Sequence, residues 1–165
     1  MKVFKFGGAS VKDAAGVQNL VLVLEKVGFK ETLIVVSAMG KTTNALEAII
    51  EAYFKNKKQT PKGILALKQF HLDVVKDLFR EESGEVEAVI HQLFEELIAF
   101  FNTNKSPDYS FVYDQVVSYG ELLSTTIIHH FVQKKKMDSF WLDARNCIKT
   151  DDYYRSANLN WELTL

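Results

Sequence analysis

A lysine and two adjacent glycines stand near the start of the chain, in the segment KFGGAS that runs from Lys5 to Ser10. They follow the strand-forming residues Val3, Phe4 and Phe6 and precede a helical pattern. Glycines at a strand-to-helix turn let a phosphate approach the backbone N–H groups closely, and Lys5 would add positive charge beside it. The pattern alone favours a tight turn that carries an exposed lysine, because adjacent glycines are common turn signals.

A second turn, SAMGKTTN, runs from Ser37 to Asn44 and is rich in hydroxyl groups. The tripeptide GKT within it resembles the end of a phosphate-binding P-loop, G-x-x-x-x-G-K-[ST]. The first glycine of that motif would fall at Val35, inside an apolar run, so the usual phosphate-cradling loop cannot form. We therefore interpret this turn as a helix N-terminus that is capped by Thr42 or Thr43.

A third segment, VSYGELLST, runs from Val117 to Thr125 and places a glycine beside a carboxylate inside a helical pattern. Gly120 would destabilise a helix interior by about 1 kcal/mol relative to alanine, which indicates either a close neighbour or a helix start. Ser118 and Glu121 match a capping box, which gives Glu121 a structural role. Glu121 could also face a cleft and pair with a substrate ammonium group, and the two roles are compatible.

Composition narrows the class of protein. A hydrophobic content of 47% predicts a globular fold, and the net charge of −1 gives no field that would attract nucleic acid or an anionic membrane. No signal peptide or membrane span is visible, so we expect a cytoplasmic domain. The single cysteine, Cys147, excludes an internal disulfide and is expected to be buried. The four histidines are expected at the core edge or the surface, and they lack metal-ligand spacing, so no metal site built from side chains is predicted.

The apolar pattern predicts an α/β domain. A helix from Val11 to Val27 separates a first strand near Val3 from the β-branched run Thr32–Met39, giving a βαβ unit with parallel strands. The second run should be buried on both faces, and Ser139–Ala144 should add a third strand to the same sheet. Further helices, forming a helical subdomain, are expected at residues 43–54, 64–80, 86–101 and 112–134. Three strands are few for such a domain, so we interpret it as the front portion of a larger one.

Taken together, these segments resemble the aspartate kinases of the amino acid kinase family. That family opens with K-F-G-G-[TS]-S, which Lys5–Ser10 matches except at Ala9. Its second strand ends in V-S-A, a short loop and T-N, as in Val36–Asn44. Its later helix carries G-E-L-x-S, as in Gly120–Ser124, and a D-x-R segment resembles Asp143–Arg145. The matches occur in order across essentially the whole chain.

The resemblance implies a fold and a reaction. The fold would be the three-layer αβα, carbamate kinase-like fold of that family, with residues 1–165 as its N-terminal, amino-acid-binding lobe. The nucleotide lobe with its G-R-G-G-S-D segment, and the ligand-sensing ACT domains, would be absent. The reaction would be ATP-dependent phosphorylation of the L-aspartate side-chain carboxylate, the first step toward lysine, threonine and methionine, with Mg²⁺ bridging the ATP phosphates. The full-length parent would be a homo-oligomer.

The resemblance also assigns roles to individual residues. Lys5 would be catalytic, neutralising charge on the transferring phosphoryl group, while Gly7–Gly8 would offer N–H groups to ATP phosphate oxygens. Ser37 would line the phosphate side of the cleft. Thr43 and Glu121 would hold aspartate, Glu121 through the ammonium group.

Two alternatives remain at this stage. One is another amino acid kinase, acting on glutamate or acetylglutamate, against which the SA…TN and GEL segments argue. The other is a non-catalytic chain that binds a ligand or a partner. Residues 1–165 alone are expected to lack kinase activity, to bind aspartate weakly and to expose an apolar patch through which they self-associate.

Overall fold

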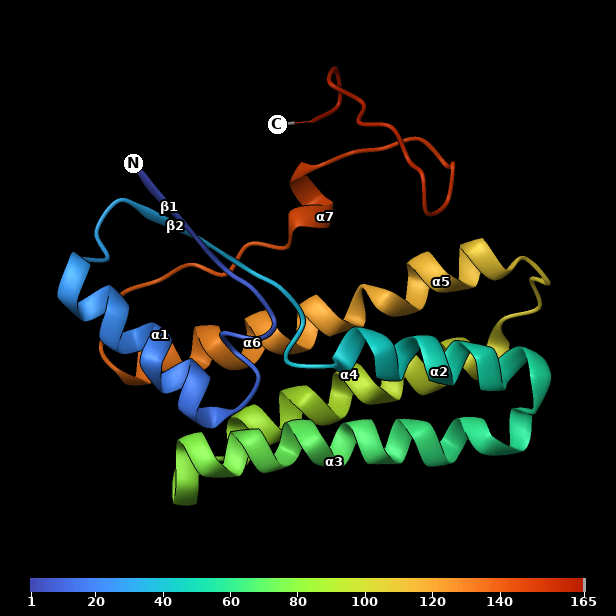
Figure 1. The fold of residues 1–165 in the computed structure, drawn as a ribbon, viewed down its shortest axis with the longest axis horizontal. Helices are drawn as coiled ribbons and strands as arrows, with labels where there is room; N and C mark the ends of the chain where they lie inside the picture. The colour runs from blue at the N-terminus through green and yellow to red at the C-terminus, as the bar shows by residue number, and fades with distance from the viewer. Residues whose placement is uncertain (165) are drawn as a thin grey trace.

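The fold pairs a small parallel sheet with a larger group of helices. The computed structural model describes residues 1–164, and Figure 1 shows the sheet beside the helices that follow it. Strands β1 (Lys2–Phe6) and β2 (Thr32–Val36) run parallel and are connected by helix α1 (Ala14–Val27). The predicted βαβ unit is therefore confirmed.

Both ends of α1 are set by local sequence. The Asp13 carboxylate accepts a hydrogen bond from the Gly16 N–H at 2.9 Å, which caps the helix N-terminus. At the other end Gly28 adopts a φ of +82°, and its N–H donates to the Leu24 carbonyl at 2.9 Å. A positive φ suits glycine, so the chain leaves the helix there and turns into β2.

The helices that follow the sheet form the expected helical subdomain (Figure 1). They are α2 (Thr42–Lys55), α3 (Thr60–Phe79), α4 (Gly84–Thr103), α5 (Tyr109–Val117), α6 (Tyr119–Lys134) and the short α7 (Ala144–Cys147), with 3-10 turns η1 (Lys57–Gln59) and η2 (Arg80–Glu82). Their shared core includes Phe94 and Phe131, which are fully enclosed. The helix expected at 112–134 is instead two helices, α5 and α6, separated at Ser118. Within residues 1–164, none of the helices is both long and apolar enough to cross a membrane.

The predicted third strand is wrong. Ser139–Ala144 forms no strand, and the sheet that the described residues build has two strands only. Side chains hold this segment to α6: the Trp141 Nε1–H donates to Thr125 Oγ1 at 3.0 Å, and the Ser139 hydroxyl lies 3.2 Å from His129 Nδ1. A strand needs a backbone partner, and an apolar, aromatic run without one remains irregular.

One face of the sheet is open. Phe4 and Ile34 pack on the core from the inner face, whereas on the outer face Val3, Leu33 and Val35 are 59%, 43% and 44% exposed. The expectation that β2 is buried on both faces is therefore wrong for this chain. The strand register places four side chains together on the outer face: Val3, Lys5, Leu33 and Val35.

We expect this outer face to drive self-association, because contiguous exposed apolar surface is a contact site. Substituting Leu33→Lys should lower the average mass measured by analytical ultracentrifugation at high protein concentration. Leu65→Lys is the matched control, since Leu65 is 66% exposed on α3 and lies outside the sheet. A strictly monomeric wild-type chain, or an equal effect of both variants, would contradict this prediction.

His71 is fully buried on α3, which contradicts its expected place at the core edge or the surface. Its Nδ1 lies 2.9 Å from the Leu67 carbonyl oxygen, and its ring packs near Phe70 and Phe94. A carbonyl can only accept, so Nδ1 carries the proton, and Nε2 has no partner within residues 1–164. Desolvation lowers the pKa of His71 from 6.5 to about 4, although the hydrogen bond to Leu67 opposes the shift.

The buried His71 should make the fold acid-sensitive. Its pKa is lower in the folded state than the unfolded value of 6.5, so its stabilising effect is complete above 6.5 and declines as the pH falls toward 4. Between pH 7 and pH 5 the free energy of unfolding should fall by about 2 kcal/mol from this group. Urea titrations of His71→Leu should show a correspondingly smaller loss over that range, and equal losses in the two proteins would refute the assignment.

Candidate active site

The first turn of the site follows β1 and is made tight by its glycines. The Ser10 N–H donates to the Gly7 carbonyl at 2.9 Å, which closes the turn. A Cβ atom on Gly8 would lie 2.6 Å from the Ala38 carbonyl oxygen and 3.3 Å from that of Gly40. A side chain at position 8 is therefore excluded by the backbone of the second turn.

The second turn follows β2 and is joined to the first by backbone hydrogen bonds. The Ser37 N–H donates to the Phe6 carbonyl at 3.1 Å, and the Gly40 N–H donates to that of Gly8 at 3.0 Å. The carboxyl ends of the two parallel strands thus meet at one edge, where ligands bind in open α/β sheets. Helix α2 begins directly afterwards, but its cap residue is Lys41 and makes no side-chain cap bond, so the predicted threonine cap is wrong.

Helix α6 meets this edge through its first turn. One oxygen of the Glu121 carboxylate accepts a hydrogen bond from the Ala38 N–H at 3.2 Å. A Cβ atom on Gly120 would lie 2.8 Å from the Ala38 Cβ, so the glycine reflects a close neighbour. The capping box is wrong: the Ser118 hydroxyl donates to the Gln115 carbonyl at 3.1 Å and makes no cap bond.

Most of the residues singled out in the sequence lie at this edge. Lys5 is the last residue but one of β1 and lies on the open face, and its amine lies 3.6 Å from the position that a Gly7 Cβ would take. Ser37 and Glu121 stand at the second turn, as described above. Thr43 lies half-buried in the first turn of α2, and none of the hydrogen bonds among residues 1–164 involves its hydroxyl. The roles assigned to these residues remain predictions.

The arrangement combines groups for an anion with a group for a cation. The Lys5 amine, the glycine turn and the positive N-terminal end of α2 favour a phosphate or carboxylate. One oxygen of the Glu121 carboxylate accepts a hydrogen bond from the Ala38 N–H. Within residues 1–164 no hydrogen bond involves the other oxygen, which can therefore accept one from an ammonium group. A ligand that carries both charges, such as an α-amino acid beside a phosphate, matches this edge.

The D-x-R segment has a local role. Asp143 caps α7, and the Arg145 guanidinium contacts its carboxylate at 2.7 Å. This hydrogen-bonded pairing lowers the pKa of Asp143. Nearby Cys147 was expected to be buried, but it is only half-buried.

Ser124 is the residue that sequence reasoning passed over. It is fully buried one helical turn after Glu121, and its hydroxyl donates to the Ser37 carbonyl at 3.0 Å. The available signal was its spacing: residues at i and i+3 on a helix share a face, so Ser124 must point the same way as Glu121.

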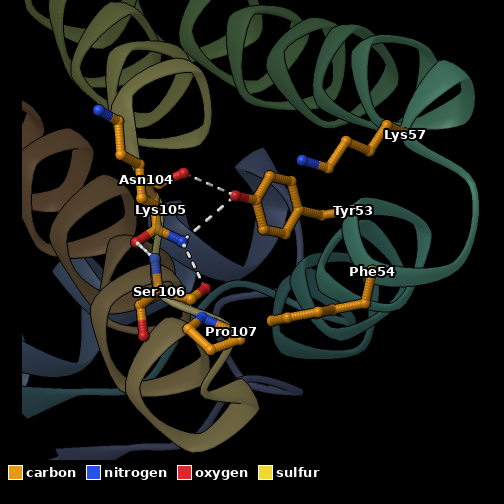
Figure 2. Close-up of a pocket in the computed structure, with 7 residues that line it drawn as sticks. All are labelled: Tyr53, Phe54, Lys57, Asn104, Lys105, Ser106 and Pro107. Atoms are coloured by element: carbon orange, nitrogen blue, oxygen red, sulfur yellow. Dashed lines mark hydrogen bonds between the residues drawn. The ribbon is translucent and has the colours of Figure 1, made fainter.

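A separate pocket of about 220 Å³ lies at the far end of α2 (Figure 2). There the Tyr53 hydroxyl donates to the Asn104 carbonyl at 3.0 Å, and the Lys57 amine lies 4.7 Å from the tyrosine ring centre. Helix α2 spans about 20 Å, so this pocket is distinct from the edge where the strands end. The tyrosine fastens the loop between α4 and α5 to α2. Residues 1–164 contain no group of three or more metal-binding side chains.

Substituting Gly8→Ala should force the two turns apart, because the new methyl carbon would lie 2.6 Å from a backbone oxygen. We expect a loss of about 2 kcal/mol in the free energy of unfolding, with NMR shift changes at residues 37–40. Gly84→Ala is the matched control, since a Cβ there meets no atom within 4 Å and alanine favours the helix. Equal stability of the two variants would rule out the proposed close approach.

Comparison with known proteins places the chain in a family. A family model described as the amino acid kinase family matches residues 1–161, nearly the whole chain. The chain therefore belongs to the amino acid kinase family.

The relatives it matches are aspartokinases. It is 31% identical over 168 residues to Aspartokinase 1, chloroplastic, of Arabidopsis thaliana (92% of this chain, 27% of that protein). It is 26% identical over 162 residues to the aspartokinase of Chlamydia pneumoniae (98% and 34%). The structure of E. coli aspartokinase III with aspartate and ADP superimposes with a TM-score of 0.85 at 23% identity, covering 99% of this chain and 36% of that one. The fold is thus that of the amino acid kinases, and the chain spans about a third or less of the length of these relatives.

Proposed function

We propose that residues 1–165 form the amino-acid-binding lobe of an aspartokinase, which transfers a phosphoryl group from ATP to the side-chain carboxylate of L-aspartate. One observation carries the proposal: the Glu121 carboxylate accepts a hydrogen bond from the Ala38 N–H at the same sheet edge where Lys5 lies near the end of β1 and the glycine turn follows. The names of the related proteins, and the aspartate and ADP in the E. coli structure, support it.

In this proposal each group at the edge has one task. Glu121 and Thr43 hold the amino acid, Glu121 through the ammonium group, which directs the side-chain carboxylate toward the glycine turn. An oxygen of that carboxylate bonds to the γ-phosphorus while the bond to the bridging oxygen breaks, and ADP leaves. Lys5 offsets the negative charge of the transferring group, and Ser37 lines the phosphate side. Positioning and charge stabilisation are the main requirements of phosphoryl transfer.

The chain's residues fit the phosphates of ATP better than they fit a metal ion. The turn at Gly7–Gly8 presents bare backbone, and no side chain can intervene at Gly8. Because residues 1–164 lack a cluster of metal-binding side chains, Mg²⁺ in this proposal is held chiefly by the ATP phosphates. The rest of the nucleotide site, a cytoplasmic location, a homo-oligomeric parent and a place in lysine and threonine biosynthesis belong to the same proposal.

Titration calorimetry with L-aspartate tests the proposal directly. Glu121→Gln should weaken aspartate binding about tenfold, because a charge-assisted contact is lost. Lys5→Ala should leave the affinity within about twofold, since its charge acts on the transferring group. Succinate is the matched ligand: it keeps both carboxylates and lacks the ammonium group, so Glu121→Gln should not weaken its binding.

The same experiment separates the alternatives. Tighter binding of L-glutamate or acetylglutamate than of L-aspartate would favour another amino acid kinase. Binding of none of these ligands would favour a non-catalytic module. A coupled ATP-turnover assay of the chain alone should show no activity, and clear turnover would mean that the nucleotide site lies within these residues.

A further inference from the structure

A single peptide group, between Ser37 and Ala38, is held at both ends by α6. Its carbonyl oxygen accepts from the Ser124 hydroxyl at 3.0 Å, and its N–H donates to the Glu121 carboxylate at 3.2 Å. The carbonyl and N–H of a trans peptide point in opposite directions, and the described residues contain no cis peptide. Two side chains one helical turn apart therefore fix the rotation of this one peptide plane.

The Ser124 hydroxyl donates its proton to the Ser37 carbonyl in preference to the other acceptor within reach. A hydroxyl has one proton to donate, and the other acceptor in reach is the Glu121 carbonyl at 3.1 Å. That carbonyl already accepts from the Thr125 hydroxyl at 2.7 Å. Among residues 1–164 the Ser37 carbonyl has no hydrogen-bond partner besides Ser124. Removing the Ser124 hydroxyl would thus leave a carbonyl unpaired next to a fully buried side chain.

Close packing prevents other groups from taking over this task. Ala38 is 4% exposed, and Gly120 and Gly8 approach it from two sides. A water molecule has little room to replace the Ser124 hydroxyl there. If the peptide plane rotates, the Ala38 N–H leaves the Glu121 oxygen, and the carboxylate loses the contact that orients it.

We propose that Ser124 is a positioning residue: it fixes the Ser37–Ala38 peptide plane and, through the Ala38 N–H, the carboxylate of Glu121. One Glu121 oxygen is thereby occupied, and the other is directed to the ligand. The effect on ligand affinity rests on the proposed function, whereas the effect on the peptide plane does not.

Hydrogen exchange of the Ala38 amide, followed by NMR without any ligand, tests the peptide plane itself. Ser124→Ala should speed the exchange of this amide about fivefold or more, the factor expected when a hydrogen bond of about 1 kcal/mol is lost. Thr103→Ala is the control, because its hydroxyl makes a bond of the same kind to the Ala99 carbonyl at 2.8 Å within α4 and makes no hydrogen bond to this peptide or to Glu121. It should leave the Ala38 exchange rate within about twofold of the wild-type rate.

Aspartate affinity provides the second measurement. Ser124→Ala should weaken aspartate binding about fivefold, and Ser124→Thr, which keeps the hydroxyl, should recover most of the loss. In a Glu121→Gln background the Ser124 substitution should have little further effect, because both act through one carboxylate. If Ser124→Ala does not fold, Ser124→Cys provides a weaker donor of similar size for both measurements.

The outcomes separate the two hypotheses. An unchanged Ala38 exchange rate in Ser124→Ala, or an equal increase in Thr103→Ala, would overturn the positioning role. Full additivity of the Ser124 and Glu121 substitutions in aspartate binding would overturn it as well. If the wild-type chain binds no aspartate, the proposed function fails, and the exchange measurement still decides the role of Ser124.

Discussion

The close packing of Ala38 between two glycines is the constraint on which the site depends. A Cβ atom on Gly8 would collide with the Ala38 carbonyl oxygen, and one on Gly120 would collide with the Ala38 side chain. Three segments far apart in the sequence, the two turns and the first turn of α6, can converge only because these two positions lack side chains. The contact explains why glycines stand at the end of a strand and within a helix, where they are otherwise unfavourable.

The helical subdomain holds α6 in the position that this contact requires. Helix α6 reaches the turns with its first residues, while the rest of its length packs in a core that contains Phe94 and Phe131. Interiors of this density resist small displacements, so the start of α6 is held against β2. The buried His71 lies beside Phe94 of this core, so its protonation in acid would weaken the packing behind α6.

Much of the fold could be predicted from local signals, because the alternation of strand and helix patterns indicated the βαβ unit. The motifs around Gly8 and Glu121 left structural and functional roles open, and only their resemblance to the aspartate kinases assigned them to one site. The errors concern features that depend on tertiary partners. Ser139–Ala144 has strand-like residues but no strand beside it, and His71 has the polarity of a surface residue but an apolar environment. Ser124 was passed over because its partner, the Ser37 carbonyl, lies 87 positions away in the chain.

The open face of the sheet has an electrostatic consequence. Lys5 shares that face with Val3, Leu33 and Val35, so any body that covers the three apolar side chains also displaces water from the lysine amine. As the effective dielectric constant falls from about 80 to about 20, the attraction between two unit charges 4 Å apart grows from about 1 to about 4 kcal/mol. Covering the sheet would therefore also strengthen the attraction of Lys5 for an anion, which stays weak while this face is in contact with water.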